Sequence, residues 1–422
     1  MTSVELEDDD GLNRVRYPER RLKLLKILET IGEYHVVDDP STYVFTTAVA
    51  VSNWLEGSPL WGMVIGPASG GKTEALAIVK HAVKQEVDDF TVPALLSWHK
   101  PTQNSPSKRA GILVRVGERG VLSVGDFSTV LSDSQRGRRE QLFSALRRIF
   151  DGRYQRDLGN ENESLVWEGR VTILAACTSA IDNFASHSDS LGPRWVYFRL
   201  PPRDSKTRRN VTSRAVRAVS ADVAERRAKA QELVEHLIHE SWESAEQLEL
   251  PENLLRAVEE AAQVVCYGRA SVPRDSSPRR EVIGLPDMEE PPRVAKQLVM
   301  LLRCLLVIGL SDGEALGIVS RVAMDSMPAV RALALGAIAA ADRPVTTAAI
   351  AKLASADWKV VNRALEDFEV IGLVSHQVGE PTFEAAAGAA QSKPWVLDHE
   401  DAGIIRTVME RRTYRVLAEL GG

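Results

Sequence analysis

The stretch LWGMVIGPASGGKTEALAIVKHAV, residues 60–83, decides the fold. An apolar run, a glycine-rich turn and a helical pattern follow one another, which predicts a strand, a loop and a helix. The turn GPASGGKT matches G-x-x-x-x-G-K-[ST] at every fixed position, and the backbone N–H groups of such a loop cradle phosphates. The residues predicted to bind a nucleotide are Gly66, Pro67, Ala68, Ser69, Gly70, Gly71, Lys72 and Thr73.

Two side chains of this loop have specific expected roles. Lys72 is expected to reach the β- and γ-phosphates, and Thr73 is expected to ligate Mg²⁺. The sequence therefore predicts ATP and Mg²⁺ as ligands. The alternative is a glycine-rich turn that binds neither.

Composition limits the class of protein. The chain has 422 residues, enough for about two or three domains, and its net charge of −6 argues against a general polyanion binder. Local basic clusters still bind nucleic acid, because salt screening confines their field to about 10 Å. Three scattered cysteines, the absence of an apolar leader and the lack of a long uncharged apolar run predict a cytoplasmic protein without a membrane span.

Five segments are predicted along the chain. An acidic, disordered tail precedes an α/β domain in which strands alternate with helices, typical of a parallel sheet covered on both faces. A helical region, a small module ending in a hairpin, and a linker with a terminal helix follow. The boundaries are 1–16, 17–203, 204–312, 313–385 and 386–422. Within the α/β domain we expect the second strand at residues 90–98.

A second strand-like segment, GVLSVGDFST at residues 120–129, ends in one acid, Asp126. Ligands bind α/β sheets at the carboxyl ends of the strands, so Asp126 is a candidate for the nucleotide site. A helix N-cap is the alternative role for this aspartate, and the two roles are compatible.

The segment after Asp126 resembles a known group of ATPases. A helix runs into IFDGRYQR, a polar turn follows, and RVTILAACT comes next. This resembles the AAA+ ATPases that carry a hairpin before the sensor-1 strand, a group that includes the MCM-like helicases and the enhancer-binding transcription activators. The resemblance covers roughly residues 40–310. It implies a sensor-1 role for Thr178, and contact of nucleic acid with the hairpin residues Arg153 and Arg156.

The same resemblance assigns two arginines. LGPRWVYFRLPP is similar to the segment that holds an arginine finger, which implies that Arg194 acts across a subunit interface, with Arg199 as the second candidate. EEPPRVAKQLVMLLRCL is similar to the sensor-2 helix of MCM proteins, in which the matching residue is Arg293. Ordinary ion pairing is the alternative for Arg194, and a helix-start arginine is the alternative for Arg293.

Residues 120–129 depart from the family pattern G-h-h-h-h-D-E-[FI]. In the ungapped alignment Gly125 takes the position of the Mg²⁺-linked acid and Asp126 that of the catalytic acid. A shift by one residue places Asp126 on the metal and leaves no base. The ungapped alignment predicts slow hydrolysis that is unusually sensitive to the Mg²⁺ concentration.

The C-terminal module resembles a winged helix-turn-helix of the MarR type. Two helices at residues 348–354 and 358–372 precede a predicted two-stranded wing around Gly379. The resemblance implies DNA contacts from Trp358, Lys359, Asn362 and Arg363, although winged helices also bind proteins. The expected core residues are Ala351, Leu353, Val361, Leu365, Phe368 and Leu373.

These features together predict a DNA-dependent AAA+ ATPase motor that forms a homo-oligomeric ring. A helicase or replication initiator of a phage or mobile element fits best. The alternatives are an ATP-switched DNA-binding regulator of transposition or transcription, and a defence-related ATPase whose winged helix binds protein. The basic stretch at residues 203–217 is either a nucleic-acid contact or a solvated surface.

Overall fold

The computed structural model describes residues 12–88, 91–98, 109–132, 135–157, 164–187, 194–217, 222–277, 280–377 and 394–412. Several predictions lie wholly or partly outside these residues. Among them are most of the acidic tail, the polar turn at residues 158–163, the wing around Gly379 and parts of the linker and terminal helix at residues 386–422.

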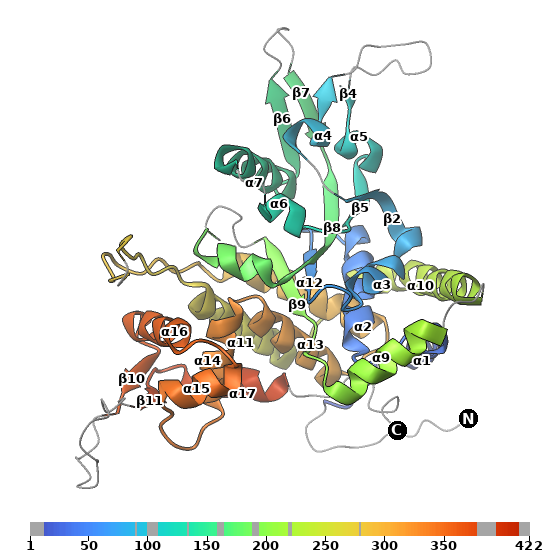
Figure 1. Cartoon of the computed structure of the whole chain (residues 1–422). Coiled ribbons are helices and arrows are strands. Elements are labelled where there is room, and N and C mark those ends of the chain that lie inside the picture. Colours follow the sequence, from blue (N-terminus) through green and yellow to red (C-terminus); the bar gives the residue numbers. More distant parts are fainter. Residues whose placement is uncertain are drawn as a thin grey trace.

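A five-stranded parallel sheet forms the centre of the molecule, which confirms the predicted α/β fold (Figure 1). The strand order is β2-β5-β8-β1-β9, so β8 lies between the strand before the phosphate loop and the strand before Asp126. The bounds are β1 Trp61–Ile65, β2 Val83–Val87, β5 Arg119–Val124, β8 Arg170–Cys177 and β9 Trp195–Arg199.

Alternation of side chains along the strands builds two cores, one on each face of the sheet. Along β8, Leu174 and Ala176 belong to one core, whereas Ile173 and Ala175 belong to the other. Burial of both faces is typical of parallel sheets and explains why the inner strands β1 and β8 read as nearly continuous apolar runs. Helices α2 Ser41–Val51 and α3 Lys72–Ala77 contact β8 on the first face, and α7 Arg136–Phe150 packs on the second.

Aromatic packing fixes the second face. The Trp61 ring lies 5.1 Å from that of Trp195 and 5.2 Å from that of Phe150, and Phe127 lies 5.3 Å from Trp195. These rings join β1, β9, α7 and the turn after β5. Since Phe127 directly follows Asp126, this packing holds the acidic turn against the sheet.

The expected second strand at residues 90–98 is wrong. The second strand of the sheet is β2, and the described part of that stretch forms α4 Val92–Leu95 and a two-residue strand, β3 Ser97–Trp98, paired with β4 Arg109–Ala110. Pro93 cannot donate to a ladder, and the Thr91 hydroxyl caps α4 by accepting from the Ala94 N–H. The polar alternation of β2 reflects its place at the edge of the sheet.

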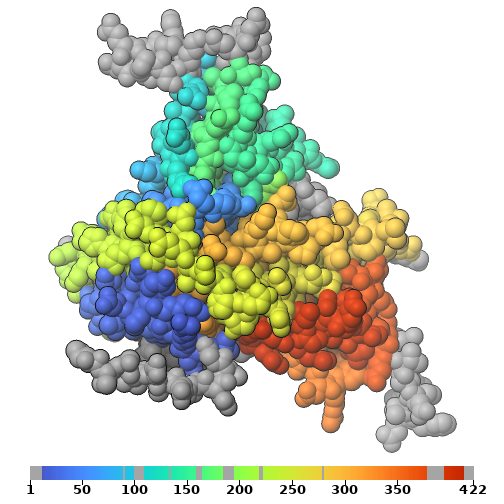
Figure 2. All heavy atoms as spheres, turned by 180° about the vertical axis from the view of Figure 1, so that it is seen from behind, coloured from blue at the N-terminus to red at the C-terminus, as the bar shows by residue number. Residues whose placement is uncertain are grey.

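The predicted hairpin arms are confirmed as β6 Arg153–Asp157 and β7 Ser164–Glu168, which pair antiparallel. The β3–β4 ribbon lies beside them, and Arg109 of β4 donates to the Val166 carbonyl. Both ribbons project from one end of the molecule, above a broader helical base (Figures 1 and 2). The short helices α5 Ile112–Val116 and α6 Ser128–Ser132 and the 3-10 turns η1 Ser52–Trp54, η2 Lys80–Ala82 and η3 Ser179–His187 complete this part.

The region at 204–312 is helical, as the sequence predicts. The N-terminal helix α1 Pro18–Tyr34 packs against this region and lies along its helix α10 Asp222–Gln247. The following helix, α13, packs on β9, and Arg16 and Arg21 pair with its Asp312 and Glu314 at 2.7 Å and 2.6 Å. The helices are α9 Ser205–Arg217, α10 Asp222–Gln247, α11 Glu252–Arg269, α12 Pro292–Val307 and α13 Asp312–Asp325.

The C-terminal module consists of α14 Ala329–Ala339, α15 Thr347–Ala354, α16 Trp358–Ile371, the paired strands β10 Val374–His376 and β11 Trp395–Leu397, and α17 Ala402–Arg411. The partner of β10 thus lies in the stretch assigned to a linker. Five of the six expected core residues are buried, but Leu353 is 70% exposed. Its position on α15 falls outside the stripe formed by Thr347, Ile350 and Ala351.

Gly309 offers a test of how tightly α1 packs against the turn between α12 and α13. A Cβ there would lie 2.3 Å from the Arg21 backbone nitrogen, and its φ is +107°. We expect Gly309→Ala to lower the free energy of unfolding by about 3 kcal/mol in urea denaturation, because backbone atoms cannot yield.

Gly372→Ala is the matched control. Gly372 has φ +83°, but a Cβ added there would meet no atom within 4 Å, so only backbone strain of about 1 kcal/mol is expected. Equal losses in the two variants would show that the contact at Gly309 is looser than described.

Candidate nucleotide site

The glycine-rich loop connects the carboxyl end of β1 to α3. Gly71 has φ +99°, a left-handed conformation that favours glycine, and it immediately precedes the first helical residue. A Cβ on Gly70 would lie 2.9 Å from the Pro67 carbonyl oxygen, so a side chain there would fill the loop. The loop therefore keeps the open backbone surface that a phosphate requires, and Pro67, Ala68 and Ser69 form its exposed turn.

Lys72 lies across this loop. Its Nζ donates to the carbonyl oxygens of Gly66 at 2.9 Å and Pro67 at 2.7 Å. Burial lowers the pKa of the Lys72 ammonium, and the nearby Asp126 carboxylate opposes that shift. The ammonium is thus held over the cradle where phosphate oxygens would replace these carbonyls, which fits a nucleotide. Thr73 is exposed in the first turn of α3.

Asp126 directly follows β5 in a tight turn. Its Oδ1 accepts the Ser128 N–H at 2.9 Å, and the Phe127 N–H donates to the Ala176 carbonyl of β8 at 2.7 Å. The aspartate therefore accepts the first N–H of α6 but lies one residue before the N-cap position predicted for it, because the helix begins at Ser128. Its exposed carboxylate still faces the edge at which the phosphate loop lies.

Thr178 follows β8 and lies between the two loops. The Ser128 hydroxyl accepts the Thr178 N–H at 2.9 Å and lies 3.0 Å from the Thr178 Oγ1. On the other side, the Gly66 N–H donates to the Cys177 carbonyl at 3.1 Å. The structure thus brings Gly66, Asp126 and Thr178 together at one edge of the sheet. Ser128, which is not predicted from the sequence, links Asp126 to Thr178.

An acid outside the motifs lies beside Gly125. Asp88 follows β2, and its Oδ1 lies 3.0 Å from the position that a Cβ on Gly125 would occupy. The Gly125 N–H donates to the Val87 carbonyl at 2.9 Å, which fixes this pairing. A second carboxylate therefore lies next to Gly125, the position at which the family pattern has the Mg²⁺-linked acid. No local sequence signal identifies Asp88, because the neighbouring strand brings it there.

Two further side chains border the loop. A Cβ on Gly71 would lie 3.4 Å from His35 Nε2 and 3.6 Å from an Arg203 nitrogen. Arg203 pairs with Asp38 at 2.5 Å, and burial lowers the pKa of His35. These residues come from the chain before β1 and after β9. They lie next to the loop only in the folded chain, and no local sequence signal predicts that position.

The helical region also contacts the helix after the loop. Arg227 of α10 makes a bidentate ion pair with Glu74 of α3, with both hydrogen bonds at 2.9 Å. Gln231 of the same helix donates to the Ala77 carbonyl at 2.7 Å. These contacts connect α10 directly to the helix that follows the glycine-rich loop.

Arg194 and Arg293 are not near the phosphate loop of their own chain. Arg194 precedes β9, at the opposite end of the sheet, a distance of roughly 15 Å along a five-residue strand. It pairs with Asp151 at 3.4 Å, and its carbonyl accepts the Gln297 side chain at 2.6 Å. Burial lowers the pKa of Arg194, Asp151 opposes that shift, and the neighbouring Arg293 adds to the lowering.

Arg199 has a structural role within the chain. Its guanidinium donates to both oxygens of Asp182, at 2.7 and 2.8 Å, and to the carbonyls of Asp325 and Met327. These bonds tie β9 to α13. All of these bonds would have to break before Arg199 could reach a nucleotide on a neighbouring subunit. Arg199 is therefore a poor candidate for the arginine finger.

The hairpin arginines differ in their surroundings. Arg153 is largely exposed and lies 3.4 Å from Glu168 across the hairpin. Arg156 donates to the Leu96 carbonyl at 2.8 Å and thereby braces the β3 segment. Of the two, Arg153 is the more available to a ligand.

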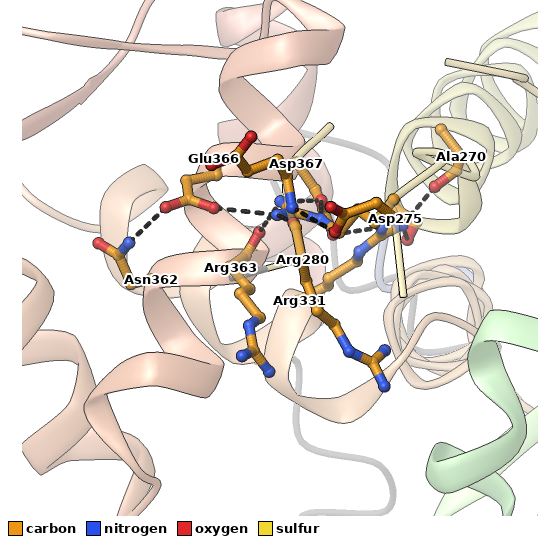
Figure 3. Close-up of polar contacts among 11 residues, drawn as sticks. Ala270, Asp275, Arg280, Arg331, Asn362, Arg363, Glu366 and Asp367 are labelled. Carbon is orange, nitrogen blue, oxygen red and sulfur yellow. Dashed lines mark hydrogen bonds and ion pairs between the residues drawn. The ribbon is translucent and has the colours of Figure 1, made fainter. Parts of the chain in front are cut away.

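The four residues predicted to contact DNA lie in the first half of α16. Trp358 and Lys359 are exposed, whereas Asn362 and Arg363 are half-buried. The Asn362 side chain donates to Glu366 at 2.7 Å and so is already engaged (Figure 3).

An ion-pair cluster covers the second half of α16. Asp367 accepts from Arg274 at 2.7 Å and from Arg331 at 2.7 Å, and Glu366 pairs with Arg274 at 3.1 Å (Figure 3). The second half of this helix is therefore acidic and bound to the loop before α12.

No family model matches this sequence, and no curated protein matches it significantly. Among the described residues, no group of three or more histidine, cysteine or acidic side chains is placed to hold a metal ion. No helix in the described part is long and apolar enough to cross a membrane.

Proposed function

We propose that this protein is an AAA+-type P-loop ATPase that binds and hydrolyses ATP and acts on DNA as an oligomeric motor. The observation that supports this best is the meeting of the phosphate loop, Asp126 and Thr178 at the carboxyl edge of a parallel sheet. An anion cradle, an acid and a hydroxyl within one edge are the parts that phosphoryl transfer to water requires.

Each residue has a defined task in the proposed reaction. Lys72 binds the β- and γ-phosphates in exchange for its two loop carbonyls. Asp126 orients the attacking water and takes its proton as the bond to the leaving ADP breaks, while Thr178 donates a hydrogen bond to the γ-phosphate. Thr73 would hold Mg²⁺ together with phosphate oxygens and waters, and the ion would supply charge neutralisation; a site with few protein ligands suits this ion. In the shifted alignment Asp126 would be the metal ligand instead of the base.

Asp88 supplies the second carboxylate in this proposal. The Asp88 carboxylate lies where a side chain on Gly125 would begin, so in this proposal the acid of the neighbouring strand takes the place of the acid that the family supplies from β5. The two-acid requirement is then met by two strands rather than by one.

Arg194 and Arg293 serve a neighbouring copy of the chain. Both lie at the amino edge of the sheet, away from their own phosphate loop, so a role in catalysis requires a second subunit. A head-to-tail contact places one subunit's amino edge against another's carboxyl edge and completes the site.

The helical region at 204–312 acts as the lid, and the C-terminal module is a winged helix. The paired ribbons β3–β4 and β6–β7 are the motor's contact with DNA, because they project together and Arg153 is exposed. A protein-docking role for the C-terminal module is the second candidate. It is favoured by the exposed apolar side chains Leu353 and Trp358 and by the acidic second half of α16.

The primary test is ATP turnover with and without DNA. We expect the full chain to hydrolyse ATP slowly and to be stimulated several-fold by single- or double-stranded DNA. Lys72→Ala should lose at least roughly 100-fold in kcat/KM, because the γ-phosphate loses its cation. No turnover in any condition overturns the ATPase, and DNA-independent turnover without DNA binding overturns the motor.

The role of Asp88 is tested by moving the acid between strands. We expect Asp88→Ala to lower kcat at least roughly 10-fold and Asp88→Ala with Gly125→Asp to recover most of it. Glu86→Ala, an exposed acid on the same strand, is the matched control and should leave turnover unchanged. Full turnover in Asp88→Ala would remove this residue from the site.

Action of Arg194 across subunits is tested by mixing two inactive variants. Lys72→Ala and Arg194→Gln should each lack ATP turnover alone. A mixture of the two should regain turnover, because about a quarter of its interfaces combine an intact phosphate loop from one subunit with an intact Arg194 from the next. Lys72→Ala mixed with Asp126→Asn should stay inactive, since both changes affect the same side of the interface and no interface then has both residues intact. No recovery in the first mixture, with both variants folded and assembled, assigns Arg194 a structural role.

A further inference from the structure

Helix α9, Ser205–Arg217, carries strong positive charge without any acid of its own. Its sequence SKTRRNVTSRAVR contains five basic residues in 13, and none of its residues is buried. Only Thr207 and Val211 are half-buried, which leaves the rest of the helix surface in solvent. The helix lies on the near face of the molecule beside α1 (Figure 1).

Packing and side-chain pairs within α9 contribute little to its stability, although the Asp204 carboxylate caps its first turn by accepting the Thr207 N–H at 2.6 Å. A helix that is polar all round normally relies on opposite-charge pairs three or four residues apart, and α9 has none. Lys206 and Arg209 are instead like charges three residues apart, as are Arg214 and Arg217, and each such pair costs about 0.2–0.5 kcal/mol. A polyanion on this surface would turn both repulsions into attraction.

We infer that α9 binds the phosphate backbone of nucleic acid. The charge and the remaining side chains favour this partner over two other classes. A membrane-surface helix needs a face of large apolar residues, and the exposed one here is Val216 alone. A protein-docking helix needs aromatic or large aliphatic anchors, which α9 lacks. Arginine, asparagine, serine and threonine are the usual donors to phosphate oxygens.

A cavity deepens this surface on one side. It has a volume of about 430 Å³, and α9 lines it with Asn210, Ser213, Arg214 and Arg217. Arg226 of α10 lines it as well, together with the acids Glu33 and Asp222, so the cavity is of mixed charge. The Arg214 guanidinium also bonds the Gly32 carbonyl. The open side of α9 offers Lys206, Arg208 and Arg209. The helix is about 20 Å long, which corresponds to roughly six base steps of a duplex.

The position of α9 links this surface to the nucleotide site. Arg203, two residues before α9, borders Gly71 and pairs with Asp38. A polyanion held on α9 would therefore be connected to the phosphate loop through a short, ordered segment. The inference takes its partner, nucleic acid, from the proposed function but does not depend on hydrolysis.

The test measures binding of a random-sequence duplex of about 20 bp by fluorescence anisotropy across a salt series, using the full chain. We expect Arg208→Gln/Arg209→Gln to weaken binding by one to two orders of magnitude at about 0.1 M salt. The slope of log K against log salt should fall by about 1.8, because each phosphate contact contributes about 0.9. Thr212→Glu should weaken binding too, by placing an acid among the basic groups.

The matched control is Lys229→Gln/Arg256→Gln, which removes the same charge from exposed positions on α10 and α11. It should retain the wild-type slope, and unfolding curves check that every variant is folded. If the wild type binds duplex and the α9 variants bind equally well, α9 is not the binding surface, but the proposal that the protein acts on DNA is unaffected. If the wild type binds anionic vesicles but no nucleic acid, both the role of α9 and the proposed action on DNA are wrong, whatever the rate of ATP turnover.

Discussion

Two hydrogen bonds to the end of β8 control the whole site. The carbonyl of Cys177 accepts from Gly66 at the start of the phosphate loop, and the carbonyl of Ala176 accepts from Phe127 in the acidic turn. One strand thus fixes both loops at adjacent positions, and Thr178, its next residue, lies between them. Because β8 is buried on both faces, this spacing cannot change without breaking both cores.

The sequence predicts the features whose signal is local. GPASGGKT specifies a loop because its glycines, lysine and threonine are all needed at fixed spacing. Helix α16 is predicted within a residue, since Asp357 caps its start and Gly372, with φ +83°, ends it. The hairpin arms and β8 are likewise set by short apolar or alternating runs. These elements alone give the α/β fold and the order of the motifs.

What the sequence does not predict depends on partners distant in the chain. β2 is not predicted, because a polar edge strand lacks an apolar run. Asp88 and His35 have no motif around them; they reach the site only because β2 pairs with β5 and the segment after α1 crosses the phosphate loop. Leu353 is assigned to the core on its apolarity, although its position on α15 points it to solvent. Hydrophobicity identifies residues that are able to be buried, and topology decides which of them are.

The polarity of the parallel sheet explains why the proposed ATPase would act as an assembly. All five strands run the same way, so the glycine-rich loop and the acidic turn lie at one edge and the residues before the strands lie at the other. Arg194 and Arg293 belong to the second edge and no rotation of side chains brings them to the first. A contact between unlike edges is heterologous, and repetition of such a contact closes into a ring or continues as a filament. In such a contact a phosphate of the next subunit would have to replace the Asp151 carboxylate, which is partly exposed and lies 3.4 Å from the Arg194 guanidinium.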